Sequence, residues 1–416
     1  MPLRTKFQRH FRRKIEQFVR ELNPAYWPLG AFVLVHDTMQ YLLHSPTTPY
    51  SYTRSRFPTQ RSLAIVMQWI TRAQDASQDG GIAAYASLYG GFGPSYPETT
   101  GYLIPTLIDY GTMSGDWSYV ERAVRAADWL VGLQSRDGAF PGGFALSSDG
   151  PSVFNTGQIL FGLLAVFQRT GDEKYRRAAL RAGQWLVSVQ SSDGSWQQYT
   201  YEGKSHVYYT MVSWALAELY KATEEPTFGR AVRHNLDWVL TQQKPNGWFE
   251  GYNLRHRPIY LHFIAYTLQG LLEAASIIGP TQVIEAVQKP AELLLRKFEL
   301  KKSLSGAYSP EWHPQALYMC MTGNAQMAIV WQRLSQITND LRFFNAALKM
   351  HELLKASLWY RGPYILRGAV KGSFPIWGRY LTFRYPNWAA KFTADSFMIE
   401  LQLLKTLYSK EMPCES

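Results

Sequence analysis

Cysteine and long apolar runs are scarce in this chain of 416 residues. Its two cysteines, Cys320 and Cys414, form neither a disulfide framework nor the paired spacing of a zinc site. Cys320 lies in an apolar run, which predicts a buried thiol. The longest early apolar stretch, residues 29–35, is too short to span a bilayer, and no cleavable signal peptide is recognisable at the N-terminus. We therefore expect a soluble, cytoplasmic protein.

Signatures of nucleotide, nucleic-acid and metal binding are also missing from the sequence. It has no phosphate-binding loop, no dinucleotide fingerprint between a strand and a helix, and no known nucleic-acid-binding module. No two histidines have the i, i+4 spacing that places two metal ligands on one face of a helix. We therefore expect no cofactor, no metal site and no nucleic-acid partner.

Positive charge is abundant and concentrated at the N-terminus. The net charge is +11, and residues 1–25 hold seven Lys or Arg against two Glu. Apolar residues recur at helical spacing within residues 1–22, which predicts a basic amphipathic helix. This helix either packs against the protein with its charges in water, or makes a peripheral contact with the inner face of a membrane. Five prolines in residues 23–60 indicate an arm or linker, so we assign residues 1–59 to an N-terminal arm.

Aromatic residues make up 15% of the chain, and many follow a repeated segment. Residues 125–140 read RAADWLVGLQSRDGAF, residues 181–196 read RAGQWLVSVQSSDGSW, and residues 232–248 read VRHNLDWVLTQQKPNGW. Each copy predicts an amphipathic helix that ends near a glutamine, then a turn in which glycine takes positive φ, then an aromatic loop. The chain is therefore a repeat protein, and we expect the glutamine to brace the turn.

Six helical hairpins account for residues 60–410, which we assign to one domain. The turn glycines are 53 to 59 residues apart: Gly80, Gly138, Gly194, Gly247 and Gly306. Short returns alternate with these turns, and the second helix of each hairpin is more apolar than the first. This contrast predicts an all-α (α/α)6 toroid with the second helices inside. The long loops then meet at one end of the ring, which we call the mouth, and function is expected there.

The repeated segments resemble the QW repeat of squalene and terpene cyclases. The matching residues are Arg125, Ala126, Trp129, Leu130, Gln134, Gly138 and Phe140, and their counterparts Arg181, Ala182, Trp185, Leu186, Gln190, Gly194 and Trp196. This resemblance implies an α/α toroid. It does not carry the cyclase chemistry, since the chain lacks the Asp-rich motif, DxDD-like or DDxxD-like, with which those enzymes protonate an alkene or epoxide. A terpenoid cyclase is therefore a minor alternative.

Residues 60–408 as a whole resemble the six-hairpin glycosidase-like superfamily. The likeness lies in the hairpin count and in loop motifs such as YPETTG at residues 96–101 and YPNWAAK at residues 385–391. That superfamily includes unsaturated-uronyl hydrolases, has related toroids in polysaccharide lyases and uronyl epimerases, and includes uncharacterised proteins associated with exopolysaccharide synthesis. The resemblance implies a protein that acts on an acidic, uronate-containing poly- or oligosaccharide, in polysaccharide biosynthesis or processing.

Two sets of residues could carry catalysis. Hydrolysis of a glycoside uses two carboxyl groups, and Glu98, which stands between Pro97 and a helix start, is the first candidate. Glu250, in a corresponding loop, is its candidate partner. A lyase or uronyl C5-epimerase instead needs a base that removes the proton next to the uronate carboxylate. His206, Tyr209 and His262 supply residue types suited to that chemistry.

Aromatic and basic residues near the mouth are the candidates for substrate binding. Flat rings pack against sugar C–H groups, and cations pair with uronate carboxylates. The candidates are Tyr96, Asn155, Trp196, Tyr208, Trp248, Arg255, Trp312, His313, Asn324, Trp388 and Lys391. The preferred hypothesis is a glycoside hydrolase-like enzyme with an acidic glycan as its partner. A lyase or epimerase, and a non-catalytic glycan-binding or scaffold component of a polysaccharide assembly system, are the alternatives.

Overall fold

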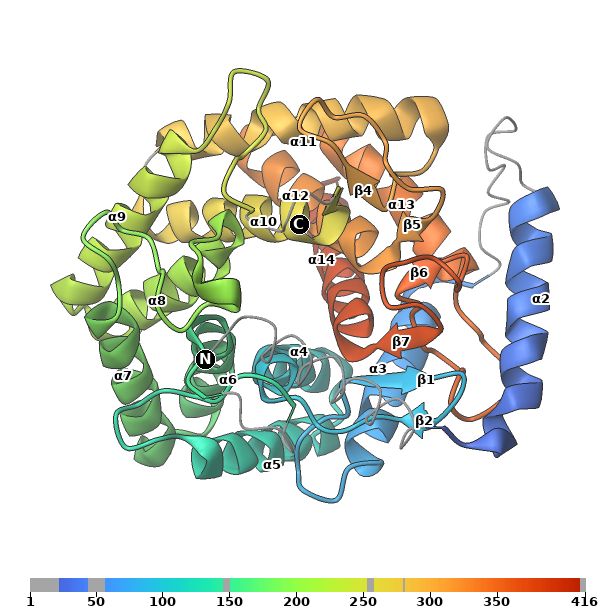
Figure 1. Ribbon diagram of the computed structural model, residues 1–416, viewed down its shortest axis with the longest axis horizontal. Coiled ribbons are helices and arrows are strands. Elements are labelled where there is room, and N and C mark those ends of the chain that lie inside the picture. Colours follow the sequence, from blue (N-terminus) through green and yellow to red (C-terminus); the bar gives the residue numbers. More distant parts are fainter. Residues whose placement is uncertain (1–21, 44–56, 145–149, 253–257, 280, 412–416) are drawn as a thin grey trace, which may run out of the picture.

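The structure, a computed structural model, describes residues 22–43, 57–144, 150–252, 258–279 and 281–411. Helices form two concentric layers around a central axis (Figure 1). The outer layer consists of α3 (Thr59–Asp75), α5 (Ser118–Leu133), α7 (Glu173–Ser188), α9 (Pro226–Thr241), α11 (Thr281–Lys301) and α13 (Leu341–Ala356). The inner layer consists of α4 (Pro97–Ser114), α6 (Val153–Thr170), α8 (Thr210–Thr223), α10 (Leu261–Ile278), α12 (Met321–Thr338) and α14 (Asn387–Glu411).

The ring is closed. Each inner helix contacts the next, and α14 contacts both α3 and α4. The inner helices are buried on most sides, whereas the outer helices are buried on one face. The fold is therefore an (α/α)6 toroid with the second helix of each hairpin inside, and the predicted fold class is confirmed. The division into an arm of residues 1–59 and a ring of residues 60–410 stays a prediction.

Short strands join the loops at the mouth. Strands β1 (Tyr85–Ser87), β2 (Gly91–Phe92) and β7 (Arg384–Pro386) form an antiparallel sheet in the order β2-β1-β7. Strand β3 (Ile259–Tyr260) pairs with β4 (Ala307–Tyr308), and β5 (Met319–Cys320) pairs with β6 (Ser373–Phe374). Because β1 belongs to the first hairpin and β7 to the last, this sheet closes the loop layer as the helices close the ring.

The repeated glutamines are structural braces, as predicted. The Nε2 of Gln190 donates to the carbonyl of Gly194 in its own turn at 3.0 Å and to the carbonyl of Ala231 in the next outer helix at 2.9 Å. Equivalent pairs of bonds join Gln74 to Gly80 and Arg122, Gln134 to Gly138 and Ala178, and Gln243 to Gly247 and Ala286. One amide thus holds each turn to the neighbouring repeat.

A turn glycine near the end of the chain closes the ring against its beginning. Gly368 has φ +78°, and a Cβ at this position would lie 2.0 Å from the carbonyl oxygen of Ile65 in α3. The Nε1 of Trp69 donates to the carbonyl of Ile365 at 2.8 Å, and the hydroxyl of Thr59 donates to Glu400 at 2.7 Å. These contacts join α3 to the last hairpin.

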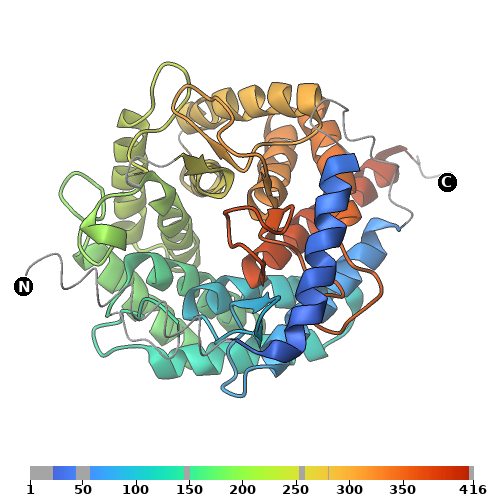
Figure 2. The ribbon, with the colours of Figure 1, turned by 45° about the vertical axis from the view of Figure 1, so that its right-hand side comes forward.

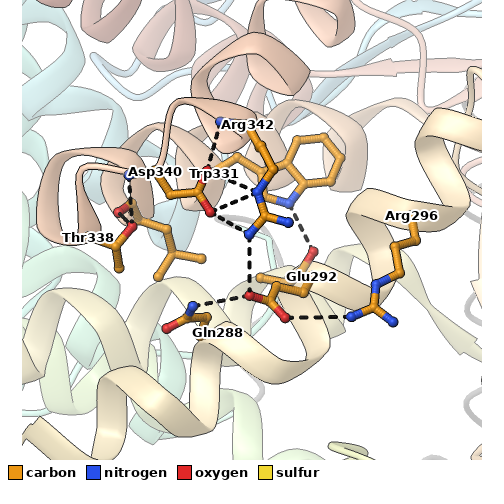
Figure 3. A network of polar contacts seen from close by, with 9 residues as sticks. Gln288, Glu292, Arg296, Trp331, Thr338, Asp340 and Arg342 are labelled. Carbon is orange, nitrogen blue, oxygen red and sulfur yellow. Dashed lines mark hydrogen bonds and ion pairs between the residues drawn. The ribbon is translucent and has the colours of Figure 1, made fainter.

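Polar contacts hold the fifth hairpin together and join it to the start of α13 (Figure 3). The Nε1 of Trp331 in α12 donates to the carbonyl of Ala291 in α11 at 3.1 Å. Asp340 caps the start of α13 by accepting from the backbone N–H of Arg342 at 2.9 Å, and Arg342 also lies 3.9 Å from Glu292 of α11. The return after α12 is thereby tied to the preceding outer helix.

Part of the expected linker is a helix. Helix α2 (Trp27–Leu43) lies outside the ring, against its right-hand side in Figure 1, and crosses in front of the ring in Figure 2. Pro28 occupies its first turn, where the missing N–H is not needed. Asp37 is fully buried and holds α2 to the loop before β7, because it accepts from Lys371 at 2.7 Å and from the N–H of Ile376 at 3.0 Å. The predicted basic helix of residues 1–22 lies almost wholly outside the described residues.

Helix α10 is long and apolar enough to cross a membrane, with a mean hydropathy of 1.3. It is an inner helix of the ring, and 72% of that segment is buried by its neighbours. Its composition therefore reflects the core of the toroid. Cys320 is buried as predicted, and burial raises the pKa of its thiol to about 12.

Removal of one brace should weaken the ring measurably. We expect Gln190→Ala to lower the free energy of unfolding by about 1–3 kcal/mol, because two backbone carbonyls lose their donor. Gly194→Ala should cost more, since a Cβ there would lie 2.1 Å from the carbonyl oxygen of His234 and the residue has φ +87°. Urea unfolding of both variants, with the exposed Gln198→Ala as control, measures the effect. Equal stability of all three variants would contradict the brace.

Candidate active site

Glu98 lies at the base of the mouth, in the first turn of α4. Its partly buried carboxyl accepts a short hydrogen bond from the hydroxyl of Tyr96, the residue that precedes the helix. Burial raises the pKa of Glu98 to about 7, against a smaller opposing effect of the Tyr96 hydrogen bond. A carboxyl with such a pKa can donate a proton at neutral pH and take one back.

Aromatic side chains from five inner-helix segments meet beneath and around Glu98. We call them the aromatic layer, and they are Tyr102, Phe154, Tyr208, Tyr266 and Phe392. Tyr266 lies 5.6 Å from Phe154 and 5.7 Å from Phe392 between ring centroids, so rings from α6, α10 and α14 converge on the axis. Glu98 acts electrostatically on Tyr208, which lies in the short helix η3 (Val207–Tyr209), and on Tyr266 across the ring. The layer accounts for the low-dielectric surroundings of Glu98.

His262 is held in one tautomer. Its Nδ1 lies 2.5 Å from Oε1 of Gln326, whose Nε2 donates to Gln269 at 3.1 Å. Because that amide oxygen can only accept, Nδ1 carries the proton and Nε2 is left as the basic nitrogen. Burial lowers the pKa of His262 to about 3, so the ring is neutral under physiological conditions. It lies beside Tyr266, with 4.1 Å between ring centroids.

Tyr96 and Trp388 belong to the same cluster. Their ring centroids are 6.5 Å apart, and both residues are partly exposed. The indole Nε1 of Trp388 donates to the hydroxyl of Tyr380 at 2.8 Å, and Tyr380 lies 5.7 Å from His262. Glu98, Tyr96, Tyr208, His262 and Trp388 are therefore brought together from four hairpins and the loops before them.

Two of the lyase-type candidates have other tasks. Both ring nitrogens of His206 face backbone carbonyls, with Nδ1 2.9 Å from that of Tyr252 and Nε2 2.8 Å from that of Tyr201. Burial lowers the pKa of His206, and the two carbonyls oppose that shift. Tyr209 is 2% exposed, and its hydroxyl accepts from the N–H of Tyr201 at 3.2 Å. Both side chains fix the loop of residues 201–209 and are not free to act on a substrate.

Glu250 does not act as a partner of Glu98. Its side chain is 58% exposed and forms an ion pair with Lys244 in the α9 turn. The pKa of Glu98 is set by burial and Tyr96, and among the described residues no other carboxyl contributes to it. The expected pairing of Glu250 with Glu98 is therefore corrected.

Several expected binding residues serve the scaffold. Trp196 is 1% exposed and donates to the carbonyl of Leu186, and Trp312 is 3% exposed and donates to that of Asn246. Trp248 packs edge to face on Trp312 at 5.1 Å. These indoles pack within the loops and cannot stack on a sugar ring, because neighbouring residues cover their faces.

The remaining polar candidates are dispersed. Asn155 is buried and donates to the carbonyl of Pro141 at 2.9 Å, and Asn324 donates to that of Cys320 at 2.8 Å. His313 is exposed on the outer loop after α11, and Arg255 lies outside the described residues. Lys391 pairs with Asp395 at 2.6 Å one turn further into the ring. The expected cationic groove is therefore corrected at Lys391, whose charge is already neutralised.

The sequence reasoning missed Tyr102, Tyr266 and Gln326. Tyr102 follows Glu98 by four residues and Tyr266 follows His262 by four, so each tyrosine lies one turn deeper on the same helical face. The i, i+4 spacing in the sequence could therefore have predicted that each tyrosine lies beneath its candidate catalytic residue. Among the described residues, no three His, Cys, Asp or Glu side chains gather as metal ligands.

Comparisons with known proteins agree with this fold. A family model described as pectic acid lyase matches residues 154–215. The squalene–hopene cyclase of Alicyclobacillus acidocaldarius is 27% identical over 166 residues, which is 35% of this chain and 26% of the cyclase. The chain thus matches about a quarter of the length of that curated relative.

Solved structures match over most of the ring. The unsaturated glucuronyl hydrolase of Bacillus sp. GL1 has a TM-score of 0.67 and 15% identity, covering 82% of this chain and 96% of its own. Cellobiose 2-epimerase from Spirochaeta thermophila has a TM-score of 0.69 and 14% identity, covering 84% and 97%. This protein shares the (α/α)6 toroid of both. At such identities the likeness establishes the fold alone.

The raised pKa of Glu98 predicts a specific pH dependence of stability. Between its usual pKa near 4.3 in the unfolded chain and about 7 in the fold, the folded state binds more protons, so stability falls as pH rises. Glu98→Gln removes this loss. We expect the free energy of unfolding of Glu98→Gln, relative to the natural protein, to increase from pH 5 to pH 8 in urea titrations. A difference that is constant over this range would refute the raised pKa.

Proposed function

We propose that this protein is a carbohydrate-active enzyme that uses Glu98 as its acid and base. The observation that carries the proposal is the carboxyl itself, which has a pKa of about 7, a hydrogen bond from Tyr96 and aromatic surroundings at the mouth of a toroid. Aromatic side chains such as Trp388 and Tyr96 suit the apolar faces of sugar rings. The glycosidase and epimerase structures that share the fold support the same class of substrate.

Among the described residues no second carboxyl acts on the pKa of Glu98, and this favours one kind of hydrolysis. Cleavage of a saturated glycoside uses two carboxyls, whereas the enol ether of an unsaturated uronyl sugar needs one group that acts twice. Glu98 would donate its proton to the carbon of the double bond, and water would add to the neighbouring carbon and return a proton to Glu98. The resulting hemiketal opens to a ketone and leaves a hydroxyl group on the anomeric carbon. This hemiacetal then collapses to an aldehyde and releases the second sugar as an alcohol. An unsaturated uronyl oligosaccharide is therefore our preferred substrate, in the processing of an acidic polysaccharide.

His262 supports a second candidate function. Its unprotonated Nε2 can remove a proton from carbon, as an epimerase or lyase requires. The neighbouring tyrosines Tyr266 and Tyr380 offer hydroxyl groups near the same place. This alternative predicts exchange of a substrate C–H with solvent that depends on His262 and not on Glu98.

The experiment uses unsaturated uronyl disaccharides, intact uronate polysaccharides and neutral disaccharides as substrates. Three readings are taken together: loss or gain of the ultraviolet absorbance of the unsaturated uronate, new reducing ends, and deuterium uptake from heavy water. We expect loss of absorbance with the unsaturated disaccharides. Glu98→Gln should lower kcat by about 10²–10⁴-fold, since general acid–base catalysis contributes that much.

Glu121→Gln is the matched control, because Glu121 is also a first-turn acid but lies on the outer helix α5 and is exposed. It should retain full activity. Deuterium uptake that disappears in His262→Gln would transfer the proposal to the epimerase alternative. No change in any of the three readings, with glycan still bound, would overturn the enzyme and leave a glycan-binding protein.

A further inference from the structure

A cavity opens at the end of the ring opposite to the mouth. Its volume is about 540 Å³, and all six inner helices line it. The lining residues recur at i, i+3 or i+4, and i+7 along five of these helices, as at Tyr102, Thr106 and Asp109 in α4, and α10 contributes Gln269 and Glu273 at i and i+4. One face of every inner helix therefore lines it.

The cavity is accessible from outside. Lining residues near the helix C-termini, such as Gln168, Gln336 and Gln402, are exposed, whereas those near the middle of the helices, such as Tyr102 and Gln269, are buried. The aromatic layer lies between this cavity and Glu98, because Tyr102 belongs to both and follows Glu98 by one turn. The cavity is thus a separate chamber with its own entrance among the short returns.

The cations that line the chamber already have partners. Lys391 lies 2.6 Å from Asp395, which also accepts from the hydroxyl of Thr106 at 2.7 Å. Arg333 donates two bonds to Glu273, at 2.8 and 2.9 Å. Arg169 lies over the ring of Trp117, with 4.4 Å from Cζ to the ring centroid. The chamber therefore offers many hydrogen-bonding groups and little free positive charge.

Further carboxyls in the chamber disfavour an anion. Asp109 and Glu218 add negative charge to the two ion pairs, and Glu218 accepts from the indole of Trp214 at 3.2 Å. Burial and the nearby Asp395 raise the pKa of Asp109 to about 6, while Lys391 lowers it. An acidic sugar would meet these carboxylates at neutral pH, whereas sugar hydroxyls can donate to them.

Two rings supply an apolar wall. Phe161 and Trp214 pack edge to face with centroids 4.6 Å apart, and Trp214 is partly exposed to the chamber. A wall of aromatic side chains, a few polar groups and a volume of this size are typical of small-molecule binding sites. We propose that this chamber is a second binding site, for a neutral mono- or disaccharide, distinct from the acid/base site at the mouth.

The test measures binding of cellobiose, maltose and glucuronic acid by isothermal titration calorimetry. We expect at least one neutral disaccharide to bind and glucuronic acid to bind at least tenfold more weakly at pH 8. Trp214→Ala and Asp109→Ala should each raise Kd at least tenfold. Trp214→Phe and Asp109→Asn, which keep ring and volume, should show smaller increases and guard against loss of the fold.

Two control variants locate the binding. Trp238→Ala changes a partly buried tryptophan on the outer helix α9, and Glu98→Gln changes the mouth, so neither should alter Kd. The absence of any heat of binding with cellobiose or maltose up to about 10 mM would overturn the proposal, because a Kd above that concentration is weaker than that of most specific sites. A Kd that changes in Glu98→Gln but not in the chamber variants would also overturn it, by placing the sugar at the mouth. Either failure leaves Glu98-dependent turnover intact, so the two proposals are tested independently.

Discussion

The architecture depends on one amide that serves two backbone carbonyls. In each of four consecutive repeats the glutamine that ends an outer helix holds its own turn glycine and a carbonyl of the next outer helix. The glycine is required because the turn packs directly on the neighbouring backbone, where a Cβ of Gly138 would lie 2.2 Å from the carbonyl oxygen of Arg181. Each repeat thereby sets the position of the next, and the chain returns to α3 and closes.

Ring closure determines the chemistry at its centre. Inner helices approach closely where glycine faces a neighbour, as at Gly101, whose Cβ would lie 2.5 Å from the Cα of Ile159. The first turns of α4 and α10 therefore place Glu98 and His262 next to the buried rings of the aromatic layer, which lie one turn deeper. Burial raises the pKa of Glu98 and lowers that of His262, so the neutral form of each side chain is favoured. Among the described residues, the groups that set these two pKa values include no charged side chain. The same geometry leaves the other end of the ring hollow.

The sequence predicted the ring well and the site only in part. Hairpins, inner and outer helices and the glutamine brace followed from periodicity and from turn glycines with positive φ. The prediction that Gly306 is a further turn glycine of this kind was wrong, since it lacks positive φ and its N–H donates to the carbonyl of Tyr318. Gly368, which has positive φ and packs against α3, is the turn glycine that closes the ring. Glu98 and His262 could be chosen because they begin inner helices. Glu250, His206 and Trp196 could not be excluded, because the sequence does not show which loop residues pair with neighbours and which face the axis.

Glu98, at the mouth that we propose binds a glycan, retains its proton up to near neutral pH, because burial raises its pKa to about 7. Infrared difference spectra of the natural protein against Glu98→Gln report the C=O stretch of this one carboxylic acid directly. We expect a protonated-carboxyl band that is present at pH 5 and disappears with a midpoint near pH 7. Disappearance of the band with a midpoint near the ordinary glutamate pKa of about 4.3 would contradict it.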